Sequence, residues 1–234
     1  KVSEKRAEKS QPSTYWILII LIVIFGGFLR WELVTGSLSW EEYKILGGSS
    51  ERSTPVESLT FSENWTNILL DYPSSDKSHL LSAVLKVSHS VWSFFANVER
   101  VKFSEFALRL PNFCASLFSI LLVGILLKNW GFGGAGILCS FLLAMHPWHI
   151  ERGILVGPDG ILIFLLLITI LSIIYSINDQ TGKWRSWIIL SIVQFLIPYL
   201  IPQGIFIAIG FMICTIVLVV HKEANYSNRS FFIN

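Results

Sequence analysis

Charged residues are scarce in this sequence. Asp, Glu, Lys and Arg make up 15% of its 234 residues, whereas about 25% is usual for soluble globular domains. Apolar residues reach 53%. This composition excludes an ordinary soluble domain and predicts an integral membrane protein.

Cysteine and net charge are also low. The three cysteines, Cys114, Cys139 and Cys214, each lie inside an apolar run, so we expect buried thiols and neither a disulfide nor a thiolate metal site. The net charge is only +2, and no basic cluster is interleaved with aromatic residues. Nucleic acid is therefore not expected as a partner.

Long apolar runs are what the sequence does contain. Four of them, 10–29, 110–127, 129–150 and 160–178, hold no Asp, Glu, Lys or Arg over at least the ~18 residues that cross a bilayer. The first is longer than the core of a signal peptide, which favours a retained anchor. A fifth run, 186–220, would extend roughly 50 Å as one helix. We expect it to fold back near 198–204, where two prolines and a glycine occur.

The predicted fold is therefore an all-α membrane domain over 15–220 with about six spanning helices. Their expected ranges are 15–30, 109–127, 132–148, 160–177, 186–200 and 203–220. A basic N-terminus, 1–14, precedes this domain, and a tail, 221–234, follows it. A long loop, 31–108, separates the first two spans.

Residues 80–98 within that loop allow two interpretations. They form either a seventh span or an amphipathic helix that lies on the membrane. Lys86, His89 and Asn97 interrupt the run, while Leu80, Val84, Val87, Val91 and Phe94 or Phe95 recur at helical spacing. This pattern favours the interfacial helix.

That choice sets the topology through the positive-inside rule. It places both termini in the cytoplasm together with Lys128, Lys183, Arg185, Lys222 and Arg229. The long first loop and the short loop 146–159 then face outward, and we expect the two loops to meet at any functional site. We expect a multi-pass protein of the bacterial inner membrane in contact with its lipids.

Two outward segments contain charged residues and histidines that could form a catalytic or binding site. Glu41 and Glu42 follow the first span. Because adjacent carboxylates on a helix diverge by about 100°, only one of the two is expected to face a given site. The alternative to a site is a solvated interfacial helix on which both glutamates face water. The short loop holds His146, His149, Glu151, Arg152 and Asp159, which indicates either a site or an ordinary polar loop. Lys77 is placed to hold a phosphate or to reach a lipid headgroup.

The order of these motifs resembles a known enzyme family. Trp40-Glu41-Glu42-Tyr43, Lys77-Ser78-His79-Leu80-Leu81, Phe106-Ala107-Leu108-Arg109-Leu110-Pro111 and His146-Pro147 with Arg152 and Asp159 are similar to elements of the family 39-like glycosyltransferases. These enzymes, the protein mannosyltransferase and aminoarabinose transferase group, have the GT-C fold. The resemblance covers residues from about 15 to 180 and is strongest from Glu105 to Asp159.

The resemblance implies transfer of a sugar from a polyprenyl-phosphate donor to an acceptor on the non-cytoplasmic face. It implies that Glu41 or Glu42 is the general base, that Asp159 is a further catalytic residue, matching the acidic residue that opens the following span, and that Lys77, Arg109 and Arg152 bind the donor phosphate. It also implies that a divalent metal, Mg²⁺ or Mn²⁺, could be held by Glu41 and Asp159.

The sequence departs from the family pattern in ways that leave a second hypothesis open. Glu-Glu replaces the usual Asp-Glu pair, and Ser78 and His79 replace two prolines. Family members also continue through several more spans, so the resemblance covers their N-terminal module alone. The alternative function is a non-catalytic subunit that keeps this scaffold and packs against other membrane proteins.

Overall fold

A computed structural model describes residues 12–39, 42, 78–96, 104–178 and 184–231. These residues form eight helices and no strand, which confirms the all-α prediction for this part of the chain. The helices are α2 (Pro12–Thr35), α5 (His79–Phe95), α6 (Glu105–Asn129), α7 (Gly133–Met145), α8 (Pro147–Arg152), α9 (Asp159–Asn178), α10 (Trp184–Leu200) and α11 (Gly204–Phe231).

Four of the helices, α2, α6, α9 and α11, are long and apolar enough to cross a membrane. The other two predicted spans are helical but shorter, with 13 residues in α7 and 17 in α10. Six spans therefore remain a prediction. The first helix is longer than the predicted 15–30, and α11 continues to Phe231, past the predicted end of the membrane domain at 220.

Helix α6 begins with a well-defined cap and tolerates an internal proline. Ser104 accepts a hydrogen bond from the backbone N–H of Ala107, as an N-cap residue does. Pro111 has no N–H to donate to the carbonyl of Ala107, four residues earlier. The hydroxyl of Ser88 on α5 donates to that carbonyl instead, at 2.5 Å, so the proline creates an attachment point for α5.

Two tight turns depend on glycine. Gly131, between α6 and α7, has a φ of 86°, a conformation that costs a glycine little. Gly204 opens α11, and a Cβ there would lie 2.6 Å from the carbonyl oxygen of Ile197. The fold-back predicted at 198–204 is thus confirmed, with the break after Leu200.

Helices α2, α6 and α7 approach one another closely. The hydroxyl of Tyr15 donates to the carbonyl of Gly124 at 2.7 Å, and Ser140 donates to the carbonyl of Ile120 at 3.0 Å. A Cβ on Gly136 would lie 2.7 Å from the Tyr15 oxygen. Small residues let the helices come this near, as is common between membrane helices.

Helix α5 packs on α6 and α10 with a different stripe from the one that we expected. The buried residues are Leu81, Leu85, His89 and Ser93. Of the predicted apolar stripe, Leu80 and Val84 are half-buried against the core. Val87, Val91, Phe94 and Phe95 are exposed, the last two at 80% and 78%. The helix is amphipathic as predicted, but the contacts with α6 and α10 use the side that carries His89 and Ser93.

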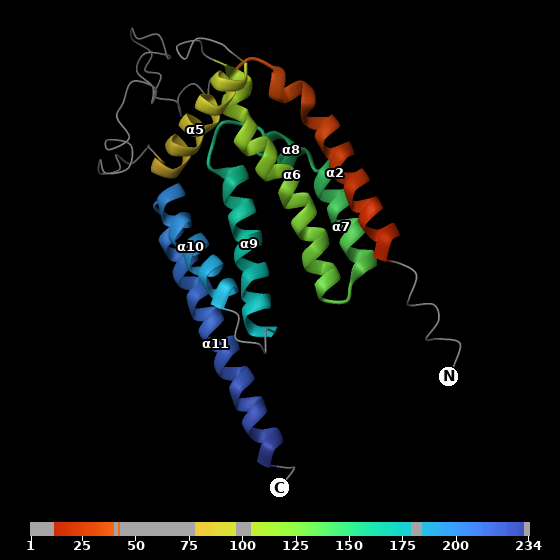
Figure 1. Cartoon of the computed structure of the whole chain (residues 1–234), viewed down its shortest axis with the longest axis vertical. Helices are drawn as coiled ribbons and strands as arrows, with labels where there is room; N and C mark the ends of the chain where they lie inside the picture. The colour runs from red at the N-terminus through yellow and green to blue at the C-terminus, as the bar shows by residue number, and fades with distance from the viewer. Residues whose placement is uncertain (1–11, 40–41, 43–77, 97–103, 179–183, 232–234) are drawn as a thin grey trace.

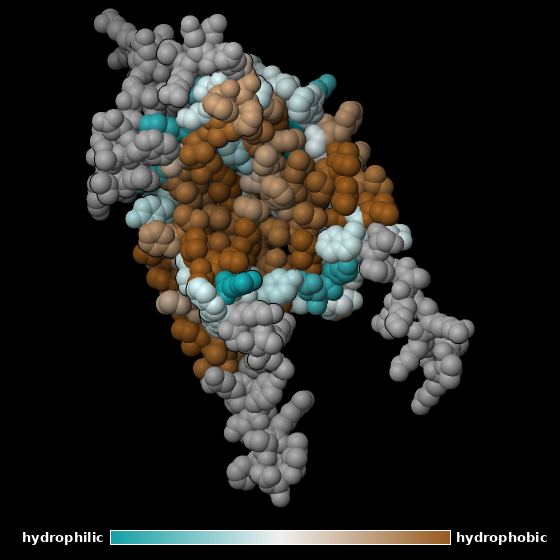
Figure 2. Space-filling view, in the orientation of Figure 1, coloured by the Kyte–Doolittle hydropathy of each residue, from teal (hydrophilic) through white to brown (hydrophobic). Residues whose placement is uncertain are grey.

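The helices form one bundle with apolar sides and polar ends. Helices α2, α6 and α7 lie together, α9 lies between α6 and α10, and α5 crosses the end at which α6 begins (Figure 1). Figure 2 shows a band of apolar surface bordered by hydrophilic residues at both ends, compatible with contact with membrane lipids. Cys214 is exposed, so the expectation of a buried thiol is wrong there, and Cys114 and Cys139 are only half-buried.

Candidate functional site

A buried ion pair joins two segments that are far apart in the sequence. Arg109 lies in the second turn of α6 and is 4% exposed, while Glu42 is fully buried. Arg109 Nε donates to Glu42 Oε1 at 2.8 Å and Nη2 donates to Oε2 at 2.6 Å, across 67 positions. This is the bidentate geometry in which arginine binds a carboxylate most strongly. We call this pair the clasp and the end of the bundle that contains it the clasp end.

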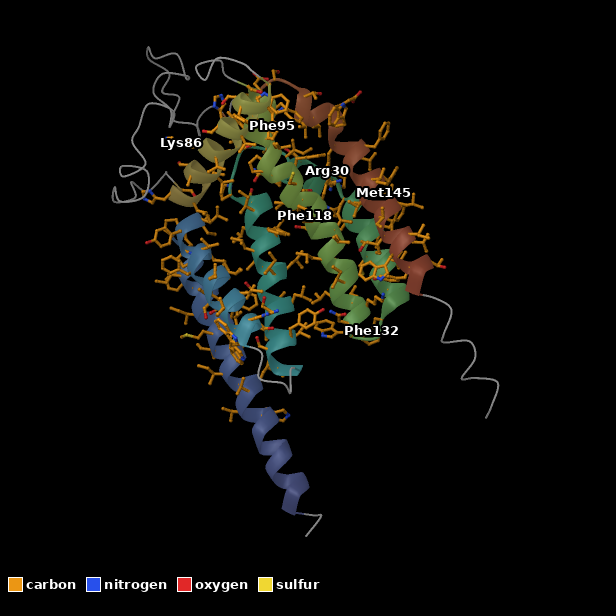
Figure 3. The ribbon with its side chains drawn as sticks, viewed as in Figure 1. Arg30, Lys86, Phe95, Phe118, Phe132 and Met145 are labelled. Atoms are coloured by element: carbon orange, nitrogen blue, oxygen red, sulfur yellow. The ribbon has the colours of Figure 1, made fainter. Side chains whose placement is uncertain are left out.

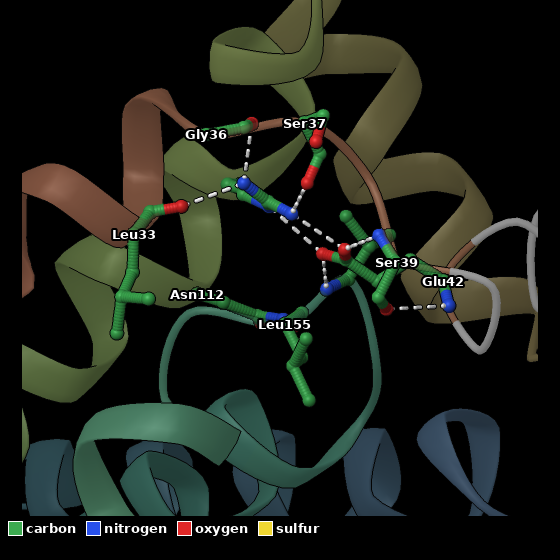
Figure 4. Close-up of polar contacts among 9 residues, drawn as sticks. Leu33, Gly36, Ser37, Ser39, Glu42, Asn112 and Leu155 are labelled. Carbon is green, nitrogen blue, oxygen red and sulfur yellow. Dashed lines mark hydrogen bonds and ion pairs between the residues drawn. The ribbon is translucent and has the colours of Figure 1, made fainter.

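The remaining donors of Arg109 bind the chain at the end of α2. Nη1 donates to the carbonyls of Leu33 at 2.6 Å and Gly36 at 2.7 Å, and Nη2 donates to Ser37 at 2.8 Å (Figure 4). The carbonyls that close a helix have no partner within it and carry partial negative charge. All five N–H donors of Arg109 are therefore used, and the guanidinium caps α2.

Glu42 is equally saturated. Its Oε1 accepts a second hydrogen bond from the backbone N–H of Val156 at 2.9 Å, and its Oε2 accepts one from Ser39 at 2.7 Å. The hydroxyl of Ser39 accepts in return from the N–H of Glu42 at 3.3 Å, which is the reciprocal pattern of a capping box. Four hydrogen bonds leave the carboxylate no free lone pair while the clasp is closed.

The surroundings keep Glu42 ionised. Burial raises the pKa of its carboxyl group, but the hydrogen bonds from Arg109, Ser39 and Val156 and the charge of Arg109 outweigh burial and hold the pKa below 4.5. Glu42 therefore stays negative at neutral pH, and it compensates the charge of Arg109.

A second buried arginine lies deeper in the bundle. Arg30 of α2 is fully buried, and Figure 3 shows it among α2, α6, α7 and α8. Its Nε donates to the hydroxyl of Ser116 at 2.9 Å, and its Nη1 donates to the carbonyls of Gly26 at 2.8 Å and Ala144 at 3.1 Å. Nη2 lies 2.8 Å from Nδ1 of His149 on α8. One side chain thus joins four helices.

The loop between α8 and α9 is held against α6 by Asn112. Its amide nitrogen donates to the carbonyls of Leu155 and Gly157. Glycine permits this close approach, since a Cβ on Gly153 would lie 2.5 Å from the hydroxyl of Ser116. Because Val156 of the same loop also binds Glu42, the loop is fixed from both sides.

The surface of the clasp end carries a weaker ion pair. Arg152 Nη1 lies 3.7 Å from Asp159 Oδ2, and these side chains are 39% and 43% exposed. His146 and Glu151 nearby are also exposed. These groups, unlike Glu42 and Arg109, can reach a ligand without the loss of a buried contact.

The predicted site residues have different outcomes. The bond from Val156 to Glu42 brings the first loop and the loop 146–159 together, as we expected. Glu42 and Arg109 bind each other, and Arg152 pairs with Asp159. Glu41 and Lys77 lie outside the described residues, so their predicted roles stay predictions.

The described residues alone do not form a metal site. They contain no group of three His, Cys, Asp or Glu side chains that could share an ion. Of the carboxylates at the clasp end, Glu42 is saturated by hydrogen bonds and Asp159 is paired with Arg152. A metal held by Glu41 and Asp159 stays a prediction.

The buried structural roles of Arg30, His149 and Asn112 were not predicted from the sequence. Ser39 and Glu42 did carry a signal, because the spacing Ser-x-x-Glu is typical of a capping box. That pattern favours a local structural role for Glu42 rather than for Glu41. Arg30 gave a weaker signal as an arginine that ends an apolar run.

No protein family, curated protein or solved structure matches this chain.

Proposed function

We propose that this chain is a membrane glycosyltransferase, or the N-terminal module of one, that takes its sugar from a polyprenyl-phosphate donor. The observation that supports this most is the hydrogen bond between Val156 and Glu42. It joins the start of the first loop to the loop that carries Arg152 and Asp159. Of the residues to which the resemblance assigns a role, Glu42, Arg109, Arg152 and Asp159 thereby lie at one end of the bundle.

The geometry suggests a division of roles between the two adjacent glutamates. Glu42 points into the clasp, and its neighbour on a helix would diverge from it by about 100°. Glu41 is therefore the general base in this proposal and removes the proton of the acceptor hydroxyl. Glu42 and Arg109 hold the segment in place and do not contact substrate.

The donor phosphate would be bound at the surface of the clasp end. Arg152 is partly exposed and has only a 3.7 Å contact with Asp159, so its guanidinium can turn to a phosphate oxygen. Lys77 is assigned to the same phosphate as a mobile positive charge. Asp159 would then orient Arg152 and interact with the acceptor side of the site.

In the membrane, we propose six spans in a GT-C-like arrangement, with α5 at the interface. Helix α7 is only about 20 Å long, so the bilayer would have to thin locally or α7 would have to be covered by protein. The positive-inside rule puts the clasp end on the non-cytoplasmic face and both termini in the cytoplasm, in a bacterial inner membrane.

Transfer of a labelled sugar from a polyprenyl-phosphate donor in liposomes tests the enzyme proposal. Glu41→Gln should lower kcat by about 10²–10⁴-fold, the usual contribution of a general base. Arg152→Gln should chiefly raise the KM for the donor. A folded parent protein without transfer to any hydroxyl acceptor would overturn the proposal, and so would full activity in Glu41→Gln.

One observation favours the alternative of a non-catalytic subunit. Every hydrogen-bonding position of the Glu42 carboxylate and of the Arg109 guanidinium is used, either between the two side chains or with the backbone. A purely structural pair would have this arrangement. Native mass spectrometry in mild detergent, with lipids retained, separates the two functions. Polyprenyl phosphate on a monomer or homodimer supports the transferase, whereas stoichiometric membrane proteins without that lipid support the subunit.

A further inference from the structure

Arg30 has an unusual environment for a buried charge. Within the described residues it forms no ion pair, and its partners are carbonyls, a hydroxyl and an imidazole. The carbonyl of Ala144 belongs to the last turn of α7, where the helix dipole favours a cation. The charge is thus balanced by the end of a helix, and the directions of its hydrogen bonds fix where α6, α7 and α8 lie around α2.

The contact with Arg30 determines which nitrogen of His149 carries the proton. A guanidinium can only donate, so Nδ1 of His149 must accept at 2.8 Å. The proton of the neutral ring is then on Nε2. Burial, with the charges of Arg30 and His146, lowers the pKa of His149 to about 4, against a smaller opposite effect of the Leu143 carbonyl. The ring is therefore neutral when it binds Arg30.

His149 is the buried residue of a short helix. Helix α8 has only six residues, and the side chain of His149 is 2% exposed. Arg152 follows one turn later on the same helix and pairs with Asp159 at the start of α9. Whatever fixes the ring of His149 therefore also fixes the backbone that carries Arg152.

We propose that Arg30 is a positioning residue that holds α8 through His149 and thereby sets the place of the Arg152 guanidinium. Arg30 touches no substrate in this arrangement. The position of α8 is a property of the fold alone, whereas its importance for transfer rests on the function proposed above for Arg152.

The position of α8 can be measured without any activity. Spin labels would be placed on the exposed positions Phe28 of α2 and Glu151 of α8 after replacement of the three native cysteines by alanine. Their distance distribution is then recorded by double electron–electron resonance. We expect one narrow distribution in the parent protein and a broad or shifted one in His149→Leu and in Arg30→Lys, which keeps the charge but loses the planar fork.

His149→Asn is the matched control. Asparagine offers an oxygen acceptor near the position of Nδ1, so it should restore the narrow distribution, which a general loss of packing would not allow. An unchanged distribution in His149→Leu would overturn the proposal. A distribution as broad in His149→Asn as in His149→Leu would also overturn it.

A double-mutant comparison then tests the link to Arg152. If Arg30 and His149 act through Arg152, His149→Leu should lower kcat/KM for the donor, and adding it to Arg152→Gln should lower kcat/KM no further. Independent, multiplying losses would overturn the role in transfer. If the parent shows no transfer at all, the proposed function fails, while the spin-label distances still decide whether Arg30 positions α8.

Discussion

The two halves of this bundle are held together by different forces. In the first half, α2, α6, α7 and α8 are joined by buried hydrogen bonds between helices, which involve two arginines, a glutamate and a histidine. In the second half, three hydroxyls donate to carbonyls of their own helix: Thr169 of α9, Ser191 of α10 and Thr215 of α11. The described contacts between those helices are largely apolar.

This difference determines how strongly each half of the bundle favours a single arrangement of its helices. A hydrogen bond between helices has a direction and a length, so it penalises a sliding or rotated neighbour. Apolar packing between membrane helices gains much less from one arrangement over another, because lipid is as apolar as leucine. We therefore expect the first half to have one arrangement and the second half, where only 11% of the span of α11 is buried, to adapt to its surroundings.

The largest expected effect comes from breaking the clasp on one side. Glu42→Leu leaves the Arg109 charge buried without its partner, which usually costs about 3–5 kcal/mol. Unfolding in detergent with a chemical denaturant would measure the loss. Asp159→Asn is the control, because an exposed ion pair contributes only about 0–1 kcal/mol.

Removing both charges of the clasp tests whether the loss of stability comes from the unpaired Arg109 charge. Glu42→Leu with Arg109→Met should recover most of the lost stability, since a buried pair can often be replaced by apolar residues. The carbonyls of Leu33, Gly36 and Ser37 would then lack their donor, so full recovery is not expected. If Glu42→Leu alone is as stable as the parent, the clasp does not hold this half together.

The next effect is a pH dependence that arises from His149 in the first half. The pKa of His149 is lowered from 6.5 to about 4, so between these values the unfolded chain binds a proton that the folded protein does not. Stability is therefore complete above pH 6.5 and falls as the pH drops toward 4, by roughly 2–3 kcal/mol. Denaturant unfolding at pH 7.5 and 4.5 would measure it.

His149→Asn separates this dependence from that of the carboxylates. The variant has no proton to gain there, so its stability should fall less between pH 7.5 and 4.5 than that of the parent. Glu42, with a pKa held below 4.5, keeps its contribution above that value and loses it only at lower pH. Identical pH curves for parent and variant would contradict the buried neutral ring.

A smaller effect is expected where α2, α6 and α7 approach closely. Gly136→Ala would place a methyl group 2.7 Å from the Tyr15 oxygen and 3.2 Å from the carbonyl of Gly124. Such overpacking costs about 1–3 kcal/mol. In a Tyr15→Phe background the nearest clash is absent, so the same change should cost less; an equal cost in both backgrounds would contradict the packing.

The sequence predicted the helices well because apolar run length and prolines act locally. The break between α10 and α11 falls at Pro202 and Gly204, while Pro198 is accommodated inside α10. The resemblance drew attention to Arg109 and Glu42. Their pairing was not predictable, since it joins residues 67 positions apart. Which of the two glutamates faces inward was not predictable either, and only the Ser-x-x-Glu spacing from Ser39 indicated Glu42.

The burial of Arg30 and the orientation of α5 could not be predicted from the sequence pattern of a single segment. Arg30 looks like a membrane boundary residue when only its own run is considered. It becomes buried because the middle of α6, the end of α7 and the short helix α8 surround it, which no local feature encodes. In α5 the periodicity gave the correct amphipathic helix, but the choice of the stripe with His89 and Ser93 for packing depends on α6 and α10.

The smallest effect lies in the second half, at Gly210 of α11. A Cβ on Gly210 would meet nothing within 4 Å, so Gly210→Ala should be neutral or stabilise the helix by about 0.5–1 kcal/mol. This is the opposite sign to Gly136→Ala, and denaturant unfolding of both variants in the same detergent tests it. A destabilising Gly210→Ala, together with loss of a co-purifying membrane protein, would mean that another chain packs against α11 at this glycine. That outcome would favour the subunit over the enzyme, because the adaptable half of the bundle would then be the half that binds a partner.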